Sequence, residues 1–303
     1  AGDVLFAQGG TVDLADTQAL YTKGIEDAEN LVWLKNDNET GVKAVREPAK
    51  SQTIYTLAPA GENTGSYAAR IGSDKYFSIN QAIKAMEAAD AEDAETNTTT
   101  IHLLRDQTED VTINNTKHSP TLNLNGYTLT GKITLTNNEN TNAFTLTDEK
   151  AADYKAGSAG GVLTGPANGI EMNNGTKSAH NTLILTGKTL TLRNLSRAVN
   201  GQDFIDIKAK DVTFTGNTDS GIRLNGSYHN IVAEGAVFTK STGYSILTNG
   251  NYSTVALKDV EIYDNSGTNS GRVYVNSNST VTVDGGKFHD NITTSQSGGV
   301  IDS

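Results

Sequence analysis

Three segments of the sequence share one length and one apolar pattern: DIKAKDVTF (206–214), NIVAEGAVF (230–238) and TVALKDVEI (254–262). A fourth segment, TVTVDGGKF (280–288), continues the series. Alternation of apolar and polar residues with a period of two is typical of a β-strand that buries one face. A unit that returns about every two dozen residues predicts a solenoid, in which successive units stack on one another.

The apolar positions of these units advance together along the chain. Two columns, each with spacings of 24, 24 and 26 residues, are Phe214, Phe238, Ile262 and Phe288, and Ile207, Ile231, Val255 and Val281. A third column is predicted to contain Ile222, Ile246, Val273 and Val300. One turn earlier, Leu185 is expected to precede Ile207 and Leu192 to precede Phe214, each by 22 residues.

Each unit contains three short alternating segments, separated by Asn-Gly, Gly-Asn and Ser-Thr-Gly turns that tolerate left-handed backbone angles. Helical repeats of similar length would need runs of Ala, Leu, Glu and Lys, which the sequence lacks. The sequence therefore predicts an all-β fold, a right-handed parallel β-helix with about three strands per turn, over residues 100–303. Equivalent residues of successive turns should stack about 4.8 Å apart.

Two polar columns support this register. A turn position suited to stacked amide hydrogen bonds holds Asn217, Ser241, Asn265 and Asn291. An outward position alternates in charge from turn to turn, through Lys210, Glu234, Lys258 and Asp284. Opposite charges on neighbouring strands attract one another, so we interpret the second column as structural.

The remaining segments complete the predicted organisation. Residues 71–99 form a capping region with a helix from Ser78 to about Glu92, which opens with a capping box of Ser78 and Gln81. Residues 1–70 form an N-terminal extension with strands near Leu31–Leu34 and Thr53–Leu57. The chain stops at Ser303 within a turn, so we expect the solenoid to continue beyond it.

Composition excludes several classes of function. The net charge is −11, with a sequence pI of about 4.9, and an acidic surface repels the phosphates of nucleic acids. The chain has no cysteine, so neither disulfides nor thiolate metal sites hold the fold. No apolar stretch is long enough to insert into a membrane. We expect a monomer without a cofactor.

Several stretches resemble a known group of proteins. They are residues 69–84 (ARIGSDKYFSINQAIK), 100–106 (TIHLLRD), 122–131 (LNLNGYTLTG), 288–291 (FHDN) and 298–301 (GGVI). They resemble the pectate-lyase-like β-helix domains of Gram-positive bacterial surface adhesins, and are most similar to the binding regions of serine-rich-repeat adhesins of lactobacilli. The resemblance implies an extracellular domain, anchored to the cell wall through other regions, that attaches to host mucin or to plant pectin-type acidic polysaccharide.

The resemblance also raises the alternative of an enzyme, because related folds host polysaccharide lyases and hydrolases. Asn217-Thr218-Asp219 resembles a polygalacturonase motif, but Gly243 to Ile246, one turn later, offers no acid, and the Gly-His-Gly and Arg-Ile-Lys motifs are missing. Inverting hydrolysis needs two carboxyl groups. We therefore interpret Asp219 as a turn residue and expect no catalytic residues.

A lyase would need calcium held by carboxylates and a base beside the uronate. The acidic groups with that potential are Asp203 and Asp206 near Lys208, and Asp259, Glu261 and Asp264. Either group could hold calcium, but a solvated acidic face is the commoner explanation, so Ca²⁺ stays an alternative. The scattered histidines indicate no metal site.

A binding domain needs aromatic and basic side chains on one surface. Tyr228 and Tyr252 are 24 residues apart and should stack on consecutive turns, while Tyr244 and Tyr274 lie beside Arg223 and Arg272. Stacking and bidentate carboxylate contacts suit acidic glycans. The candidate glycan-binding residues are Tyr228, Tyr252, Arg223, Tyr244, Arg272, Tyr274 and Lys208. The alternatives are that stacked tyrosines only protect turn backbone, and that the domain is a spacer.

The charge balance adds an expectation about pH. An acidic domain repels uronate or sialylated polymers near neutral pH. Carboxylates titrate near pH 4, whereas Arg and Lys stay charged there. The sequence therefore predicts binding to acidic polysaccharide that strengthens as the pH falls toward 4.

Overall fold

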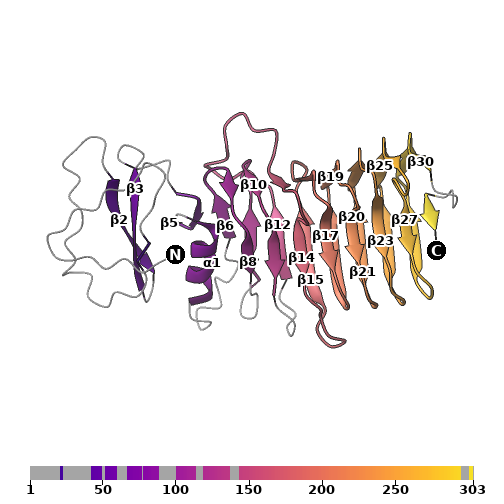
Figure 1. Ribbon diagram of the computed structural model, residues 1–303, viewed down its shortest axis with the longest axis horizontal. Helices are drawn as coiled ribbons and strands as arrows, with labels where there is room; N and C mark the ends of the chain where they lie inside the picture. Colours follow the sequence, from indigo (N-terminus) through magenta and orange to yellow (C-terminus); the bar gives the residue numbers. More distant parts are fainter. Residues whose placement is uncertain are drawn as a thin grey trace.

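A computed structural model gives the fold of the chain (Figure 1). It describes residues 21–22, 42–49, 52–59, 67–76, 78–88, 100–113, 119–136, 143–294 and 300–302. From residue 100 onward, short strands are stacked side by side along one long axis, which makes a parallel β-solenoid of about eight turns. The predicted fold class is confirmed.

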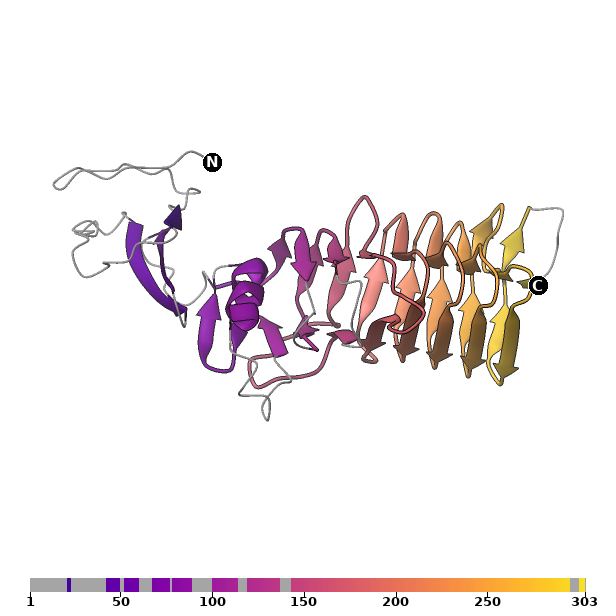
Figure 2. The same cartoon turned by 90° about the horizontal axis from the view of Figure 1, so that it is seen from below.

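Three parallel sheets run along the solenoid, and each turn contributes one strand to each sheet (Figure 2). Sheet 1 contains β6 (Thr100–Leu103), β9 (Thr121–Asn123), β12 (Ala143–Thr147), β15 (Asn181–Thr186), β18 (Ile205–Lys210), β21 (Asn230–Glu234), β24 (Thr254–Lys258) and β28 (Thr280–Asp284). Sheet 2 contains β7 (Gln107–Thr108), β10 (Thr128–Thr130), β13 (Val162–Thr164), β16 (Thr191–Arg193), β19 (Thr213–Thr215), β22 (Val237–Thr239), β25 (Glu261–Tyr263) and β29 (Lys287–His289). Sheet 3 contains β8 (Val111–Ile113), β11 (Ile133–Leu135), β14 (Ile170–Met172), β17 (Arg197–Gly201), β20 (Ser220–Leu224), β23 (Tyr244–Thr248), β27 (Val273–Val275) and β31 (Ile301–Asp302).

A few strands lie outside this regular pattern. β26 (Ser266–Gly267) pairs in parallel with β30 (Ile292–Thr293). β4 (Ala69–Ile71) joins sheet 1 antiparallel to β6, and β5 (Asp74–Tyr76) pairs with β4. β1 (Tyr21–Thr22), β2 (Val42–Ala49) and β3 (Gln52–Pro59) form a separate antiparallel sheet. The predicted strand at Thr53–Leu57 falls within β3, whereas the one at Leu31–Leu34 lies outside the described residues.

The helix α1 (Ile79–Ala88) lies at the N-terminal end of the solenoid (Figure 2). The Ser78 hydroxyl accepts a hydrogen bond from the Gln81 amide at 3.0 Å, which caps the helix as predicted. The helix is described as far as Ala88, and its predicted end at Glu92 lies outside the described residues. Its apolar face is buried in the same core as the strands, at Ile79, Ala82, Ile83 and Met86.

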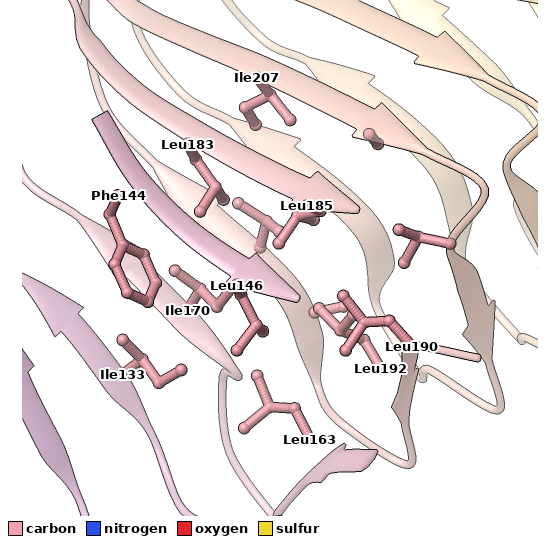
Figure 3. Close-up of a cluster of buried hydrophobic side chains, with 14 of the residues drawn as sticks. Ile133, Phe144, Leu146, Leu163, Ile170, Leu183, Leu185, Leu190, Leu192 and Ile207 are labelled. Carbon is pink, nitrogen blue, oxygen red and sulfur yellow. The ribbon is translucent and has the colours of Figure 1, made fainter. Parts of the chain in front are cut away.

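The core lies inside the solenoid and receives side chains from all three sheets. Phe144 and Leu146 of sheet 1, Leu163 of sheet 2, and Ile133 and Ile170 of sheet 3 point into one interior (Figure 3). All five are fully buried. Because this interior is only as wide as one turn, a chain with few large apolar residues can fill it.

The strand register confirms most predicted columns. Ile207, Ile231, Val255 and Val281 are successive partners, as are Leu192, Phe214, Phe238, Ile262 and Phe288. Two assignments were wrong: Leu185 pairs with Ala209, and Val273 pairs with Ile301. The corner between β15 and β16 has four residues, whereas the corner between β18 and β19 has two. The spacing of 22 residues between Leu192 and Phe214 on sheet 2 therefore does not apply to Leu185 on sheet 1.

Both polar columns are present. Asn217 and Asn265 are fully buried, and the side chains of Ser241, Asn265 and Asn291 each accept a hydrogen bond from the backbone amide of the preceding turn, at 2.9–3.2 Å. Lys210 and Lys258 both approach Glu234, at 3.4 and 3.7 Å, on the solvent side of sheet 1. The first column ties the corners of successive turns together from inside.

Candidate functional site

An aromatic ladder runs along the corner at which sheet 3 leads into sheet 1 of the next turn. Its members, from successive turns, are His180, Phe204, Tyr228 and Tyr252. The rings of Phe204, Tyr228 and Tyr252 are nearly parallel, with centroids 5.1 Å apart and interplanar angles of 2° and 15°. His180 meets Phe204 edge-on, with centroids 5.6 Å apart. Tyr228 and Tyr252 are 43% and 53% exposed, so the predicted stack exists at the surface.

The backbone of the ladder residues is left-handed, with φ of +56° at Phe204, +66° at Tyr228 and +60° at Tyr252. The other two corners of the same turns also need a left-handed residue. Except at Lys240, this residue is Gly, Asn or Asp. The residues are Asp211, Gly235, Asp259, Gly285, Asn194, Gly216, Asp264 and Asp290. The ladder corner itself accepts Asn in the next turn, at Asn278 with φ of +58°. The backbone therefore does not require aromatic residues here.

Stacking among the rings does not explain this choice alone. A left-handed conformation costs a residue with a Cβ atom about 1–2 kcal/mol. Each stacked aromatic pair returns about 0.5–1.5 kcal/mol. The two terms nearly cancel, and about half of each tyrosine still faces water. Exposed aromatic side chains in such a row are typical of an interaction surface.

The stacking also limits how a ligand can use the ladder. Both faces of Tyr228 are covered by neighbouring rings, so this side chain offers only its edge and its hydroxyl. Among the described residues, the outer face of Tyr252 has no aromatic neighbour, because the next turn places Asn278 at this position. A sugar ring can therefore contact the exposed part of Tyr252 and the edges of the preceding rings.

A buried histidine lies directly after the ladder residue Tyr228. His229 is 2% exposed, and neither ring nitrogen has a hydrogen-bond partner within the described structure. Burial lowers the pKa of His229, and the nearby backbone of Gly226 and the carboxylate of Asp203 offset only part of this effect. His229 is therefore neutral in the folded protein at neutral pH.

Acidification should destabilise the corner through His229. Its pKa in the folded state lies below the ordinary value of 6.5, so protons bind preferentially to the unfolded chain, and stability is lost as the pH falls below about 6.5. The previous turn has Ile205 at this position, which makes His229→Ile a natural replacement. We expect its melting temperature to exceed that of the wild type by a margin that grows from pH 7.5 to pH 4.5.

The control for this experiment is His289→Gln. His289 is exposed, and hydrogen bonds to Asp290 and Glu261 raise its pKa. This variant should show no gain on acidification. A margin for His229→Ile that stays constant with pH would contradict the assignment.

The outer face of sheet 3 carries the predicted arginine and tyrosine residues. Glu171, Asn200, Arg223, Leu247 and Tyr274 are successive strand partners and form one outward row, hereafter the sheet 3 row. Tyr274 meets Tyr244 edge-on, with ring centroids 6.2 Å apart. The structure thus brings Arg223, Tyr244 and Tyr274 onto one face.

Arg272 lies under this face rather than on it. It is 3% exposed, its guanidinium lies 5.9 Å from the Tyr244 ring centroid, and it donates a hydrogen bond to Asn269 at 3.2 Å. Lys208 lies elsewhere, exposed on sheet 1 and in register with Val232. The aromatic ladder occupies the corner between the sheet 3 residues and Lys208.

Three contributors to this surface were missed from the sequence. Phe204 precedes Tyr228 by 24 residues, so the spacing contained the signal. His180 continues the ladder edge-on. Arg197 lies beside Arg223 because both bind Asp219, and no regular spacing relates them.

The acidic residues considered for catalysis have other partners. Asp219 binds the two arginines, and a Cβ atom on Gly243, its counterpart one turn later, would overlap the Asp219 carbonyl. Asp203 accepts a hydrogen bond from the Ser227 amide at 2.6 Å, and Asp206 pairs with His180 at 2.8 Å. Within the described ranges, no three His, Asp or Glu side chains are grouped so as to hold a metal ion.

The chain is a β-solenoid protein whose architecture is consistent with the pectate-lyase-like β-helix domains. A scan against protein-family models matches no family, and searches of curated proteins and of solved structures find no match. Among the described residues, no helix has the length and apolar character needed to cross a membrane.

Proposed function

We propose that this chain is the non-catalytic binding domain of an extracellular adhesin on a bacterial cell surface, and that it attaches to acidic polysaccharide of the host-mucin or plant-pectin type. The observation that carries the proposal is the aromatic ladder. Tyr228 and Tyr252 hold exposed rings, and Phe204 a partly exposed one, in a left-handed backbone conformation that Asn278 adopts without an aromatic side chain. The resemblance to adhesin domains supports the location and the class of ligand.

The sheet 3 row supports an acidic ligand. Arg223 and Tyr274 lie in this row on either side of the buried Leu247, so the row presents a cation and an aromatic ring along the axis. Such a row suits an extended sugar chain that carries carboxylates, because arginine binds carboxylates in a bidentate manner and rings pack on sugar carbons.

Binding is expected to strengthen as the pH falls. The net charge of −11 repels an anionic polymer at pH 7, whereas protonation of surface carboxylates near pH 4 removes this repulsion and leaves arginine charged. We expect roughly tenfold tighter binding to polygalacturonate or mucin at pH 4 than at pH 7, an order of magnitude typical of electrostatic attraction. The affinity of the protein for surface-immobilised polysaccharides, measured at both pH values, tests this expectation.

The His229→Ile variant is the control, because it removes the buried group whose protonation perturbs the ladder corner. Equal binding at both pH values would contradict the predicted pH dependence. No binding at either pH would contradict the proposal and favour a spacer. Release of unsaturated or reducing ends from polygalacturonate, with or without calcium, would instead favour the enzyme alternative.

A further inference from the structure

Two guanidinium groups on successive turns share one carboxylate on sheet 3. The Arg197 Nε donates to Asp219 Oδ2, and Arg223 Nη1 donates to both carboxylate oxygens of Asp219, at 3.0 and 3.2 Å. The side chains of Arg197 and Arg223 are 28% and 25% exposed. Asp219 thus holds the two cations next to each other, and both remain in reach of solvent.

Each arginine is also fixed by a second contact. Arg197 Nη1 donates to Asn200 Oδ1 at 3.2 Å, and Arg223 Nε donates to Asn225 Oδ1 at 3.3 Å. The Nη2 group of neither arginine has a partner among the residues that the structure describes. Two fixed guanidinium groups therefore retain N–H donors, and a ligand that binds them needs to order no flexible side chain.

The local charge is opposite to that of the whole chain. Two arginines against the single Asp219 leave one positive charge. On the N-terminal side, Glu171 is paired with Lys132 at 3.0 Å, and on the C-terminal side the row continues with the uncharged Leu247. In a chain with a net charge of −11, this patch is a place where an anionic group is attracted.

We propose that Arg197 and Arg223 form an anion subsite that takes one carboxylate or sulfate group of an acidic polysaccharide, while Tyr274 contacts the adjoining sugar. This inference rests on the proposed function. It adds Arg197 to the proposed binding residues and names the chemical group that they recognise. A carboxylate and a sulfate ester each offer at least two anionic oxygens to paired guanidinium donors.

The test compares Arg197→Ala and Arg223→Ala with Arg193→Ala. Arg193 is exposed on sheet 2, and its loss changes the net charge by the same amount. By calorimetry at pH 5 and low salt, we expect each sheet 3 variant to bind polygalacturonate about tenfold more weakly than the wild type, as for loss of a charge-assisted bidentate contact. Arg193→Ala should stay within about twofold, because Arg193 lies on sheet 2 and contributes only its charge, not a direct contact with a ligand on sheet 3.

Two further variants keep the test decisive if an alanine variant misfolds. Arg197→Lys and Arg223→Lys retain the charge and the pairing with Asp219 but lose the fork of N–H donors. If an alanine variant melts at a lower temperature than the wild type, the corresponding lysine variant decides the outcome. It should still bind more weakly than Arg193→Ala.

The choice of probes identifies the recognised group. Fully methyl-esterified polygalacturonate should not bind, whereas dextran sulfate that binds with the same arginine dependence would assign a sulfate. If the wild type binds polygalacturonate and the arginine variants lose no more than Arg193→Ala, the subsite is wrong and the proposed function stands. If the methyl ester binds equally well, the carboxylate is not the recognised group, and both the subsite and the acidic ligand class are wrong. If the wild type binds neither acidic polymer, both are wrong.

Discussion

Replacement of Asn265 by leucine is expected to lower the free energy of unfolding by roughly 3 kcal/mol or more, because it leaves several buried polar groups without partners. Asn265 is fully buried. Its amide nitrogen donates to the carbonyls of Phe238 and Tyr263 at 3.1 and 3.0 Å and to the side chain of Asn291 at 2.8 Å. Its oxygen accepts from the Ser241 amide at 2.9 Å. Leucine fills a similar volume but satisfies none of these groups.

The control variant is Asn265→Ser. Ser241 occupies the same column one turn earlier, where its hydroxyl accepts from the Asn217 amide at 3.2 Å. A serine at position 265 can take over the corresponding bond to Ser241, so we expect less than half of the loss seen with leucine. Urea unfolding gives the stability, and hydrogen exchange of the Ser241 amide reports the bond itself. Equal losses in the two variants would show that the buried amide column does not stabilise the stack.

Replacement of Gly250 by alanine is expected to cost roughly 3 kcal/mol, at the upper end of the range for overpacked interiors. A Cβ atom at Gly250 would overlap the carbonyl group of Gly226 in the preceding turn. The two corners are also tied by Asn249, whose Nδ2 donates to Asn225 Oδ1 at 3.1 Å and whose backbone amide donates to Leu224 at 2.9 Å. The two corners cannot move apart without losing these hydrogen bonds.

Gly165→Ala is the matched control, because the nearest atom to a Cβ there would be 3.5 Å away, in ordinary contact. Its effect on the melting temperature should be small. Gly250→Ala should also change the near-ultraviolet circular dichroism, because Tyr252 lies two residues further along the same corner and stacks on Tyr228. An unchanged melting temperature and an unchanged tyrosine signal would contradict the close approach of the two turns.

The fold could be predicted from the sequence because a stack of turns repeats its apolar columns. Phe214, Phe238 and Ile262 recur at equal spacing, since each must fill the same place in successive turns. The prediction failed where corner length changes. Leu185 pairs with Ala209 rather than Ile207, because the corner that follows β15 is two residues longer than the one that follows β18.

The candidate site was less predictable. Spacing alone predicted that Tyr228 would stack on Tyr252, but it could not show that the rings would cover one another's faces. Face-to-face stacking depends on the left-handed backbone of the corner. No local sequence pattern indicates a left-handed backbone at an aromatic residue. Arg197 was missed because its position relative to Arg223 depends on a shared contact with Asp219.

The columns of this solenoid have a consequence for how recognition can change in evolution. The spacing between equivalent residues varies, from 21 between Ile101 and Leu122 to 39 between Leu146 and Leu185, and the strands still pair in register. Extra residues are accommodated at corners, so a lineage can lengthen, shorten or recombine turns while the interior stays continuous. A single substitution in an outward row then changes one point of contact along a linear ligand and leaves its neighbours in place. Such a protein can acquire a new binding preference one contact at a time.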